Sequence, residues 1–244
     1  MFTLLNLRNK KLGMSSKKQG LSSIGRKVLM ALTGFFLMFF LLQHLSINMM
    51  SVISADLFNN VSHFMGTNPV VQGLLQPVLI FSVVFHFIWG MVLEYQNTQA
   101  REVKYAMYKG SANATWMSRN MIISGLAVLA FLCLHFYDFW IPEIALKYGE
   151  GDMSGLIEGT EHFRYHEELV HKFAHQPWRV VLYVISFVML SLHLLHGFQS
   201  AFQSVGFSSR KYTPVIKILG NIFAIAVPLG FIFIALYHYN IHPH

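Results

Sequence analysis

Charged residues are scarce in this sequence. They make up 12% of its 244 residues, whereas 54% are hydrophobic and 22 are phenylalanine. A soluble domain carries a charged fraction of about 25%. The composition therefore excludes an ordinary soluble domain and indicates an integral membrane protein.

Cysteine is limited to one residue, Cys133, which lies within an apolar run. A disulfide within the chain, a CxxCH haem-attachment motif and a cysteine ligand set for an iron–sulfur cluster are therefore excluded. A glycine-rich dinucleotide-binding motif is also absent. Any cofactor of this chain is expected to be held by histidine.

Acidic residues are missing from the first 27 residues, where the basic residues are Arg8, Lys10, Lys11, Lys17, Lys18, Arg26 and Lys27. The net charge of +7 would suggest nucleic-acid binding in a soluble chain, but here the basic residues lie in separate short segments. Because this distribution follows the positive-inside rule, we expect a cytoplasmic N-terminus and no nucleic-acid partner.

Five apolar runs are long enough to cross a hydrocarbon core of about 30 Å, which needs roughly 20 helical residues. They cover residues 28–52, 70–95, 120–140, 178–202 and 214–237. We therefore predict an all-α membrane protein in which residues 1–244 form one domain with five transmembrane helices.

The connections between these runs alternate in charge. Those expected on the cytoplasmic side are basic, with Arg101, Lys104, Lys109, Arg119, Arg210 and Lys211. Those expected outside are acidic, with Asp56, Asp138, Glu143, Glu150, Asp152, Glu158, Glu161, Glu167 and Glu168. The alternation predicts a multi-pass membrane protein in contact with lipid, oriented with its basic loops in the cytoplasm. The expected location is a bacterial inner membrane. The outer segment 141–177 is expected to contain an interfacial amphipathic helix.

Four of the five predicted helices carry histidine inside the apolar run. The residues are His44, His86, His135, and the pair His193 and His196. An ionisable residue inside a membrane is costly and is by default a candidate functional residue. One buried histidine has a structural explanation more often than not, but a set on four helices indicates a shared site.

The depths of these histidines fall into two levels. His44 and His135 each lie about 16 residues, or roughly 24 Å of helix, from the inner ends of their runs. His86 and His193 lie about as far from the outer ends, and hence in the inner half. Two imidazoles at one depth are what a low-spin haem b needs as axial ligands of its iron. A structural zinc site fits less well because it needs four ligands around one ion.

We therefore predict two haems b and a bundle of the first four helices around them. His44 and His135 are the expected ligands of the outer haem, and His86 and His193 those of the inner haem. His196 is the second choice. It lies about 60° from His193 around the helix, where it is expected to hydrogen-bond a propionate or the backbone.

Glycines give further candidates, because a flat macrocycle needs a close approach to the helix backbone. Gly90 and Gly197 each follow an inner histidine by four residues, on the same helix face. Gly34 and Gly125 each precede an outer histidine by ten residues and are expected near the level of the inner haem. Packing of helices through small residues explains the same positions equally well.

Propionates or a quinone would also need polar donors near the two faces. The candidates are Arg26, Lys27 and Arg119 on the inner side and Gln43 and Arg179 on the outer side. Each is also explained as an interfacial anchor.

The outer segment contains four further histidines, His162, His166, His171 and His175. They would hold a metal ion as two i, i+4 pairs on a helix, or they would line an interfacial helix that covers the outer haem. A third possibility is that they exchange protons beside a quinone. The interfacial helix is the preferred interpretation.

The pattern resembles a known family, the membrane-anchor cytochrome b subunits of succinate:quinone oxidoreductases (succinate dehydrogenase/fumarate reductase) in their single-chain dihaem form. The resemblance covers nearly the whole chain. It rests on one histidine in each of the first four helices, on GRKVLMALTG before FFLMFFLLQH, and on Gly197 and Gly206 after His193.

The resemblance implies an electron-transfer subunit of the respiratory chain and tricarboxylic acid cycle that reacts with a quinone, expected to be menaquinone. A flavoprotein and an iron–sulfur subunit would bind on the cytoplasmic face and oxidise succinate there. In some dihaem fumarate reductases an acidic residue two positions before the helix-four ligand serves transmembrane proton transfer. Ser191 takes that position here, so this proton path is not expected.

Two other functions stay open at this point. One is a cytochrome b of a hydrogenase, formate dehydrogenase or nitrate reductase, which shares haems held by two histidines but has other partners. The other is a transporter whose histidines relay protons. A transporter is expected to carry membrane-embedded carboxylates or broken helices, and the apolar runs hold almost no acidic residues.

Overall fold

The computed structural model describes residues 22–100, 121–207 and 209–241, and these residues are almost entirely helical. Within them the only β-type pairing is an isolated bridge between Leu156 and Phe163. Five helical segments are long and apolar enough to cross a membrane. The predicted all-α fold with five spans is confirmed.

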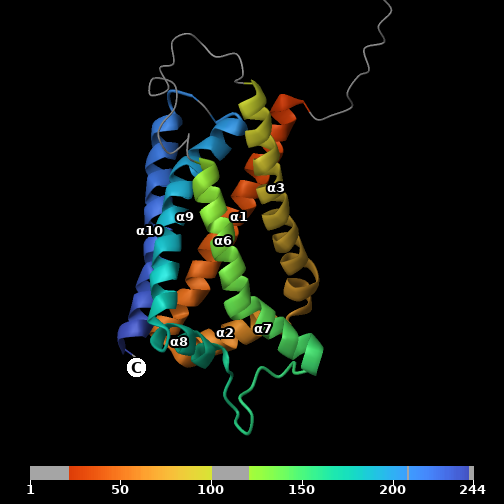
Figure 1. Ribbon diagram of the computed structural model, residues 1–244, viewed down its shortest axis with the longest axis vertical. Coiled ribbons are helices and arrows are strands. Elements are labelled where there is room, and N and C mark those ends of the chain that lie inside the picture. Colours follow the sequence, from red (N-terminus) through yellow and green to blue (C-terminus); the bar gives the residue numbers. More distant parts are fainter. Residues whose placement is uncertain (1–21, 101–120, 208, 242–244) are drawn as a thin grey trace, which may run out of the picture.

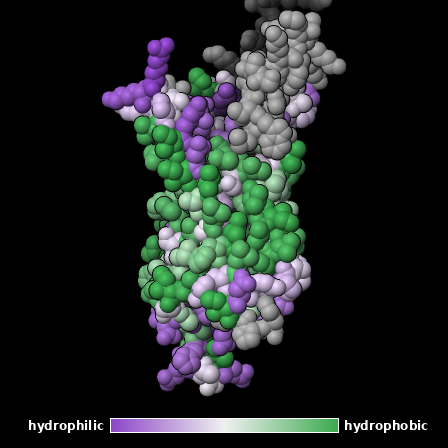
Figure 2. All heavy atoms as spheres, turned by 90° about the vertical axis from the view of Figure 1, so that its left-hand side faces the viewer, coloured by the Kyte–Doolittle hydropathy of each residue, from purple (hydrophilic) through white to green (hydrophobic). Residues whose placement is uncertain are grey.

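The five spans run side by side, and shorter helices cover one end of them (Figure 1). In chain order the helices are α1 (Ser23–Ile53), α2 (Ala55–Thr67), η1 (Val71–Leu75), α3 (Gln76–Ala100), α6 (Met121–His135), η2 (Phe136–Trp140), α7 (Ile141–Ile144), η3 (Ala145–Glu150), α8 (Tyr165–Ala174), α9 (Pro177–Ser204) and α10 (Thr213–Ile241). The segments labelled η are π-helical. An apolar band separates two polar ends (Figure 2).

The two ends differ in structure, and we name them accordingly. The basic end is where α1 begins and α9 gives way to α10, with Arg26, Lys27, Arg210 and Lys211. The capped end is the opposite one, where α2 and α8 lie across the spans. Arg119 lies outside the described residues.

The third span is longer than its apolar run. The prediction ended it at residue 140, whereas α6, η2, α7 and η3 continue as one helical segment from Met121 to Glu150. The helix therefore extends beyond the predicted apolar run, and the boundary of the membrane span at residue 140 stays a prediction. Glu143 and Lys147 form an ion pair of 2.7 Å one turn apart, so the helix continues with its charges paired.

Helix α2 was not predicted at all. Residues 53–69 were interpreted as a connection, but Ala55–Thr67 form a helix. The Ser54 hydroxyl caps it by accepting a hydrogen bond from Leu57 N, and Asp56 lies in its first turn. Both features favour a helix start. The predicted helix within 141–177 is present as α8.

The core of the protein lies toward the capped end. It centres on aromatic residues from α2, α8, α9 and α10, among them Phe58, Phe173, Tyr183, Phe187 and Phe231. Helix α3 packs mainly against α1 and stays the most exposed of the spans. Helix α3 therefore contributes least to the core among the five spans.

Helix α10 closes the bundle against α1 and α9. A Cβ atom on Gly220 would lie 2.8 Å from Phe198 Cδ1, and one on Gly230 would lie 2.9 Å from Leu45 Cδ1. Both glycines therefore permit close helix packing. Toward the capped end, Ser51 of α1 lies 2.9 Å from the buried Nε2 atom of His238 on α10.

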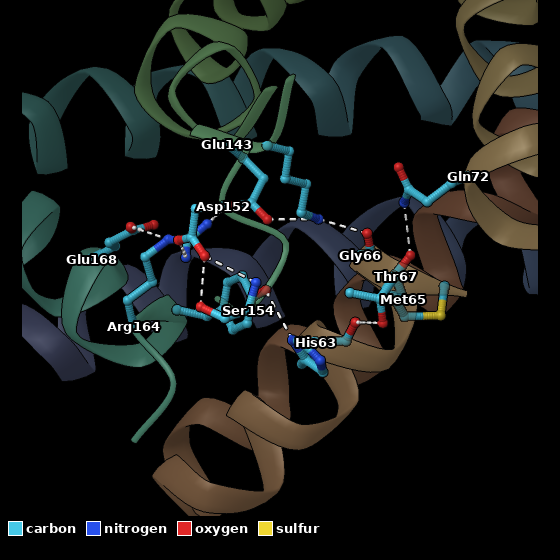
Figure 3. A network of polar contacts seen from close by, with 12 residues as sticks. His63, Met65, Gly66, Thr67, Gln72, Glu143, Asp152, Ser154, Arg164 and Glu168 are labelled. Carbon is cyan, nitrogen blue, oxygen red and sulfur yellow. Dashed lines mark hydrogen bonds and ion pairs between the residues drawn. The ribbon is translucent and has the colours of Figure 1, made fainter. Parts of the chain in front are cut away.

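Arg164 joins the segments of the capped end (Figure 3). Its guanidinium forms ion pairs with Glu143 (2.6 Å), Asp152 (3.0 Å) and Glu168 (3.1 Å). Lys147 adds α2 to this network by donating a hydrogen bond of 2.6 Å to the carbonyl of Gly66. One arginine thus holds the end of the third span, the 151–164 loop and α8 together.

Replacing Arg164 should loosen the capped end. In Arg164→Gln three carboxylates lose their common partner, which should cost about 2–3 kcal/mol of local stability. Hydrogen exchange of amides in α8 and the 151–164 loop should become faster, with little change in α10. The control is Lys172→Gln within α8, which removes a positive charge that forms no ion pair among the described residues. Equal exchange in both variants would contradict this role.

Acid should loosen the same loop through Asp152. Hydrogen bonds from the hydroxyl and amide of Ser154, together with the charge of Arg164, lower the pKa of Asp152 from 3.8. Because the pKa of Asp152 is lower in the folded than in the unfolded protein, its ionised form stabilises the fold at pH values above the unfolded-state pKa. This stabilisation is lost as the pH falls through the folded-state pKa. Pepsin cleavage within 151–164 should therefore rise as the pH falls below about 4. Asp152→Asn should be cleaved at a rate with little pH dependence, after correction for pepsin activity.

Candidate cofactor site

The structure brings the histidines of the first four spans together in two pairs. The rings of His44 on α1 and His135 on α6 have centroids 5.7 Å apart. Those of His86 on α3 and His193 on α9 have centroids 6.5 Å apart. These are the pairs that depth along the helices predicted. The first lies toward the capped end and the second toward the basic end.

The ring spacing suits one metal ion between the two imidazoles of each pair. A metal–imidazole bond is about 2 Å long and the nitrogen lies about 1 Å from the ring centre, so two rings on opposite sides of one ion have centroids roughly 6 Å apart. Both pairs match this spacing. Groups of three or more His, Cys, Asp or Glu that would hold a metal are absent from the described residues.

Two hydroxyl groups fix the proton position on the basic-end histidines. The Thr33 hydroxyl donates to the Met30 carbonyl (2.9 Å), so its oxygen is left to accept from His86 Nδ1 at 3.0 Å. Ser124 likewise donates to the Met121 carbonyl and lies 3.3 Å from His193 Nδ1. With Nδ1 carrying the proton, the Nε2 atom of each ring keeps its lone pair, as a metal ligand requires.

The capped-end pair is held differently. Asn48 lies 3.4 Å from His44 Nδ1, and its side chain donates to the His44 carbonyl at 2.8 Å. His135 Nδ1 is buried and has no hydrogen-bond partner within the described part of the chain. Phe131 and Phe139 pack against the His135 ring instead. The His135 imidazole is therefore held by aromatic packing rather than by a hydrogen bond to Nδ1.

Gly34 and Gly125 show how far apart the two levels are. A Cβ on Gly34 would lie 3.7 Å from His86 Cε1, and one on Gly125 would lie 3.6 Å from His193 Cε1. Both glycines therefore lie at the basic-end level, as predicted. Each precedes a capped-end histidine by ten residues, so the two levels are about 15 Å apart along the helices.

The two halves of the site are built alike. Thr33 and Gly34 on α1 have the same spacing to His44 as Ser124 and Gly125 on α6 have to His135. The sequence analysis missed Thr33 and Ser124. The signal was available as a hydroxyl residue followed by glycine, eleven residues before the histidine in both helices.

Comparison with known proteins identifies the chain. Residues 96–228 match the family model described as succinate dehydrogenase/fumarate reductase transmembrane subunit. The chain belongs to this family. A curated relative, the succinate dehydrogenase cytochrome b558 subunit of Bacillus subtilis (strain 168), is 24% identical over 111 residues, which are 45% of this chain and 50% of the relative. The chain thus matches about half the length of that relative. No solved structure matches.

The region shared with the succinate dehydrogenase/fumarate reductase family includes only part of the site. His135 and His193 lie within residues 96–228, whereas His44 and His86 precede them. The pairing of each matched histidine with an earlier one therefore comes from the structure of this chain.

The remaining glycine candidates do not touch histidine. A Cβ on Gly90 would lie 3.4 Å from Met30 Cε, and one on Gly197 would lie 3.8 Å from Met121 Cε. Both glycines thus face methionine side chains at the basic end. Their predicted contact with a macrocycle stays a prediction.

The polar candidates at the basic end differ in their contacts. Arg26 donates a hydrogen bond of 2.8 Å to Gln96 Oε1, which ties α1 to α3, and the side chain of Lys27 is exposed. His196 is half-buried and faces neither histidine of the other helices in a ring contact among the described residues. Its predicted bond to a propionate stays a prediction.

The polar candidates at the capped end are Gln43 and Arg179. Gln43 is half-buried on α1, next to His44. Arg179 is buried, and its Nε atom lies 2.9 Å from Oδ1 of Asp138, which the sequence analysis treated only as an outer charge. Tyr183 donates a hydrogen bond of 2.9 Å to the other oxygen of Asp138. Arg179 is therefore part of a buried cluster and not a separate surface donor.

Of the two predicted i, i+4 pairs of outer histidines, His171 and His175 are in contact, whereas His162 and His166 do not share a helix. Helix α8 begins at Tyr165, so His162 precedes it in an exposed turn. His166 lies against His238 of α10, with ring centroids 5.5 Å apart. His171 and His175 are neighbours at 5.4 Å. The metal alternative has no support in the described residues, and α8 lies across the capped end as a covering helix.

Proposed function

We propose that this chain is the dihaem b membrane anchor of a succinate dehydrogenase/fumarate reductase complex. In this role it passes electrons between a partner iron–sulfur subunit and a membrane quinone, which we propose to be menaquinone. Succinate is handled by the partner flavoprotein. The basic end faces the bacterial cytoplasm and binds both partners there, as the positive-inside rule favours.

The observation that carries this proposal is the pairing of four membrane-embedded histidines at two levels. Each pair has the spacing of two axial ligands, and the two levels are about 15 Å apart. The name of the Bacillus subtilis relative, a cytochrome b558, supports haem binding as the use of these histidines. When bound, haem b supplies a one-electron carrier at each level.

The protein residues prepare the two levels for such a group. Thr33 and Ser124 hold the rings of His86 and His193 with their Nε2 lone pairs available. Gly34 and Gly125 leave the backbone of α1 and α6 bare beside those rings. A Cβ would fit there at an ordinary contact distance, so the protein atoms alone do not demand glycine. A flat macrocycle against the helix accounts for both.

A histidine-based transporter is a poorer explanation of the same residues. It is expected to carry unpaired carboxylates within the spans. Two of the acidic residues in the outer part of the third span are paired, Asp138 with Arg179 and Glu143 with Lys147, and the third, Glu150, is the exposed last residue of the segment. The family match also favours succinate-linked partners over those of other quinone-linked dehydrogenases.

Histidine substitutions test the two haem levels. The purified complex should contain two haems b per chain by pyridine haemochrome spectroscopy. His44→Ala or His135→Ala should remove one haem, and His86→Ala or His193→Ala should remove the other. The matched control is His196→Ala, one turn from His193, which should keep both.

A tagged wild-type chain should also co-purify a flavin-containing, succinate-oxidising partner. A haem-free wild-type protein, or loss of haem in His196→Ala but not in His193→Ala, would contradict the assignment. Co-purification of a hydrogenase or formate dehydrogenase would favour the other cytochrome b families.

Thr33→Val tests the hydrogen bond behind His86. Valine has nearly the shape of threonine but cannot accept the Nδ1 proton, so the ligand tautomer is no longer fixed. Loss of such an outer-shell partner typically weakens metal binding 10- to 100-fold. The basic-end haem should therefore be lost preferentially during detergent purification. Ser46→Ala is the control, because Ser46 on the same helix donates only to the Leu42 carbonyl. Equal haem retention in both variants would contradict a role for Thr33.

A further inference from the structure

A charge pair lies beside one level of the site, and the described residues hold no counterpart at the other level. Asp138 is 2% exposed and Arg179 is 7% exposed, although both lie within spans. All five ion pairs among the described residues involve the capped-end segments, and none includes a neighbour of His86 or His193. The two histidine pairs therefore differ in their electrostatic surroundings.

Each group of the charge pair is held by further contacts. Arg179 Nε lies 2.9 Å from Asp138 Oδ1, and the Tyr183 hydroxyl donates to Oδ2 at 2.9 Å. The guanidinium also lies over the ring of Trp178, 4.7 Å from its centroid. Both oxygens of the carboxylate thus have partners. Oδ1 is served by the ion pair with Arg179 and Oδ2 by the hydrogen bond from Tyr183, and opposite charges offset part of each other's cost of burial.

The cluster reaches His135 by two routes. Asp138 follows His135 by three residues along the same helix, within the π-helical segment η2. The ring of Tyr183 lies 6.4 Å from the ring of His135 and 5.0 Å from that of Phe131. Because His135 Nδ1 has no hydrogen-bond partner among the described residues, ring packing of this kind positions the imidazole.

We propose that Asp138 is a positioning residue which, with Arg179 and Tyr183, sets the reduction potential of the haem held between His44 and His135. This rests on the proposed function. A carboxylate near an iron centre stabilises the oxidised, more positive state and lowers the potential. Arg179 offsets that charge, and Tyr183 fixes its place beside the ligand ring. The capped-end haem thus has a potential set independently of the basic-end haem.

The decisive variant is Asp138→Asn, which keeps the size of the side chain and removes its charge. Arg179 cannot lose its proton and is left as an unbalanced positive charge. The capped-end haem should titrate at a more positive potential, and the basic-end haem should be unchanged. The measurement is a spectroelectrochemical titration of the purified complex, in which the haem absent from His44→Ala identifies the capped-end step.

Two further variants separate charge from packing. Glu143→Gln removes the same charge from the same span but about one and a half turns farther from His135, so its shift should be smaller. Asp138→Asn combined with Arg179→Gln removes both charges and should return the potential toward the wild-type value. If Asp138→Asn does not assemble, Arg179→Gln should instead shift the capped-end step to a more negative potential.

An unchanged or more negative capped-end potential in Asp138→Asn, with both haems present, would overturn the proposal. So would a double variant that keeps the full shift of the single one, because packing rather than charge would then be the cause. If Asp138→Asn does not assemble, an Arg179→Gln complex with an unchanged capped-end potential would overturn the proposal. Haem content reports separately on the proposed function, since a haem-free wild-type complex would refute that function whatever the potentials.

Discussion

Every polar group in the apolar part of this bundle has to find its partner inside the protein, because hydrocarbon offers none. Thr33 and Ser124 serve His86 and His193 in this way, and Arg179 and Tyr183 serve Asp138. The helices can carry histidines and a carboxylate through the membrane only because these partners exist. Among the described residues the buried Nδ1 atom of His135 has no hydrogen-bond partner, and aromatic rings hold this imidazole instead.

The site is assembled from two similar halves. In the first, α1 supplies a hydroxyl, a glycine and a capped-end histidine, and α3 supplies His86. In the second, α6 and α9 supply the same groups in the same order. Within the first half the Thr33 hydroxyl of α1 contacts His86 of α3, and within the second the Ser124 hydroxyl of α6 contacts His193 of α9. Each histidine pair contains one histidine from the first half and one from the second. Neither half can complete a pair alone, so the halves depend on each other.

Much of this arrangement followed from the sequence. Apolar run lengths gave five spans, and helical rise alone paired His44 with His135 and put Gly34 at the level of His86. These features depend only on distance along a helix. The continuation of the helix to Glu150 and the start of α2 rest on local features, the Glu143–Lys147 pair and the Ser54 cap, which a search for apolar runs does not detect. The partner of Arg179 depends on which residues meet across the bundle. A single sequence does not show such a contact.

The close fit of α10 has a consequence for the order of assembly. This helix carries no histidine of either pair, yet Gly230 meets Leu45 and His238 meets Ser51 of α1. Because α10 is made after the four histidine helices, its contacts with the first of them form only once those four are already available. During synthesis there is thus an interval in which the four histidine helices have been made and α10 does not yet pack against them.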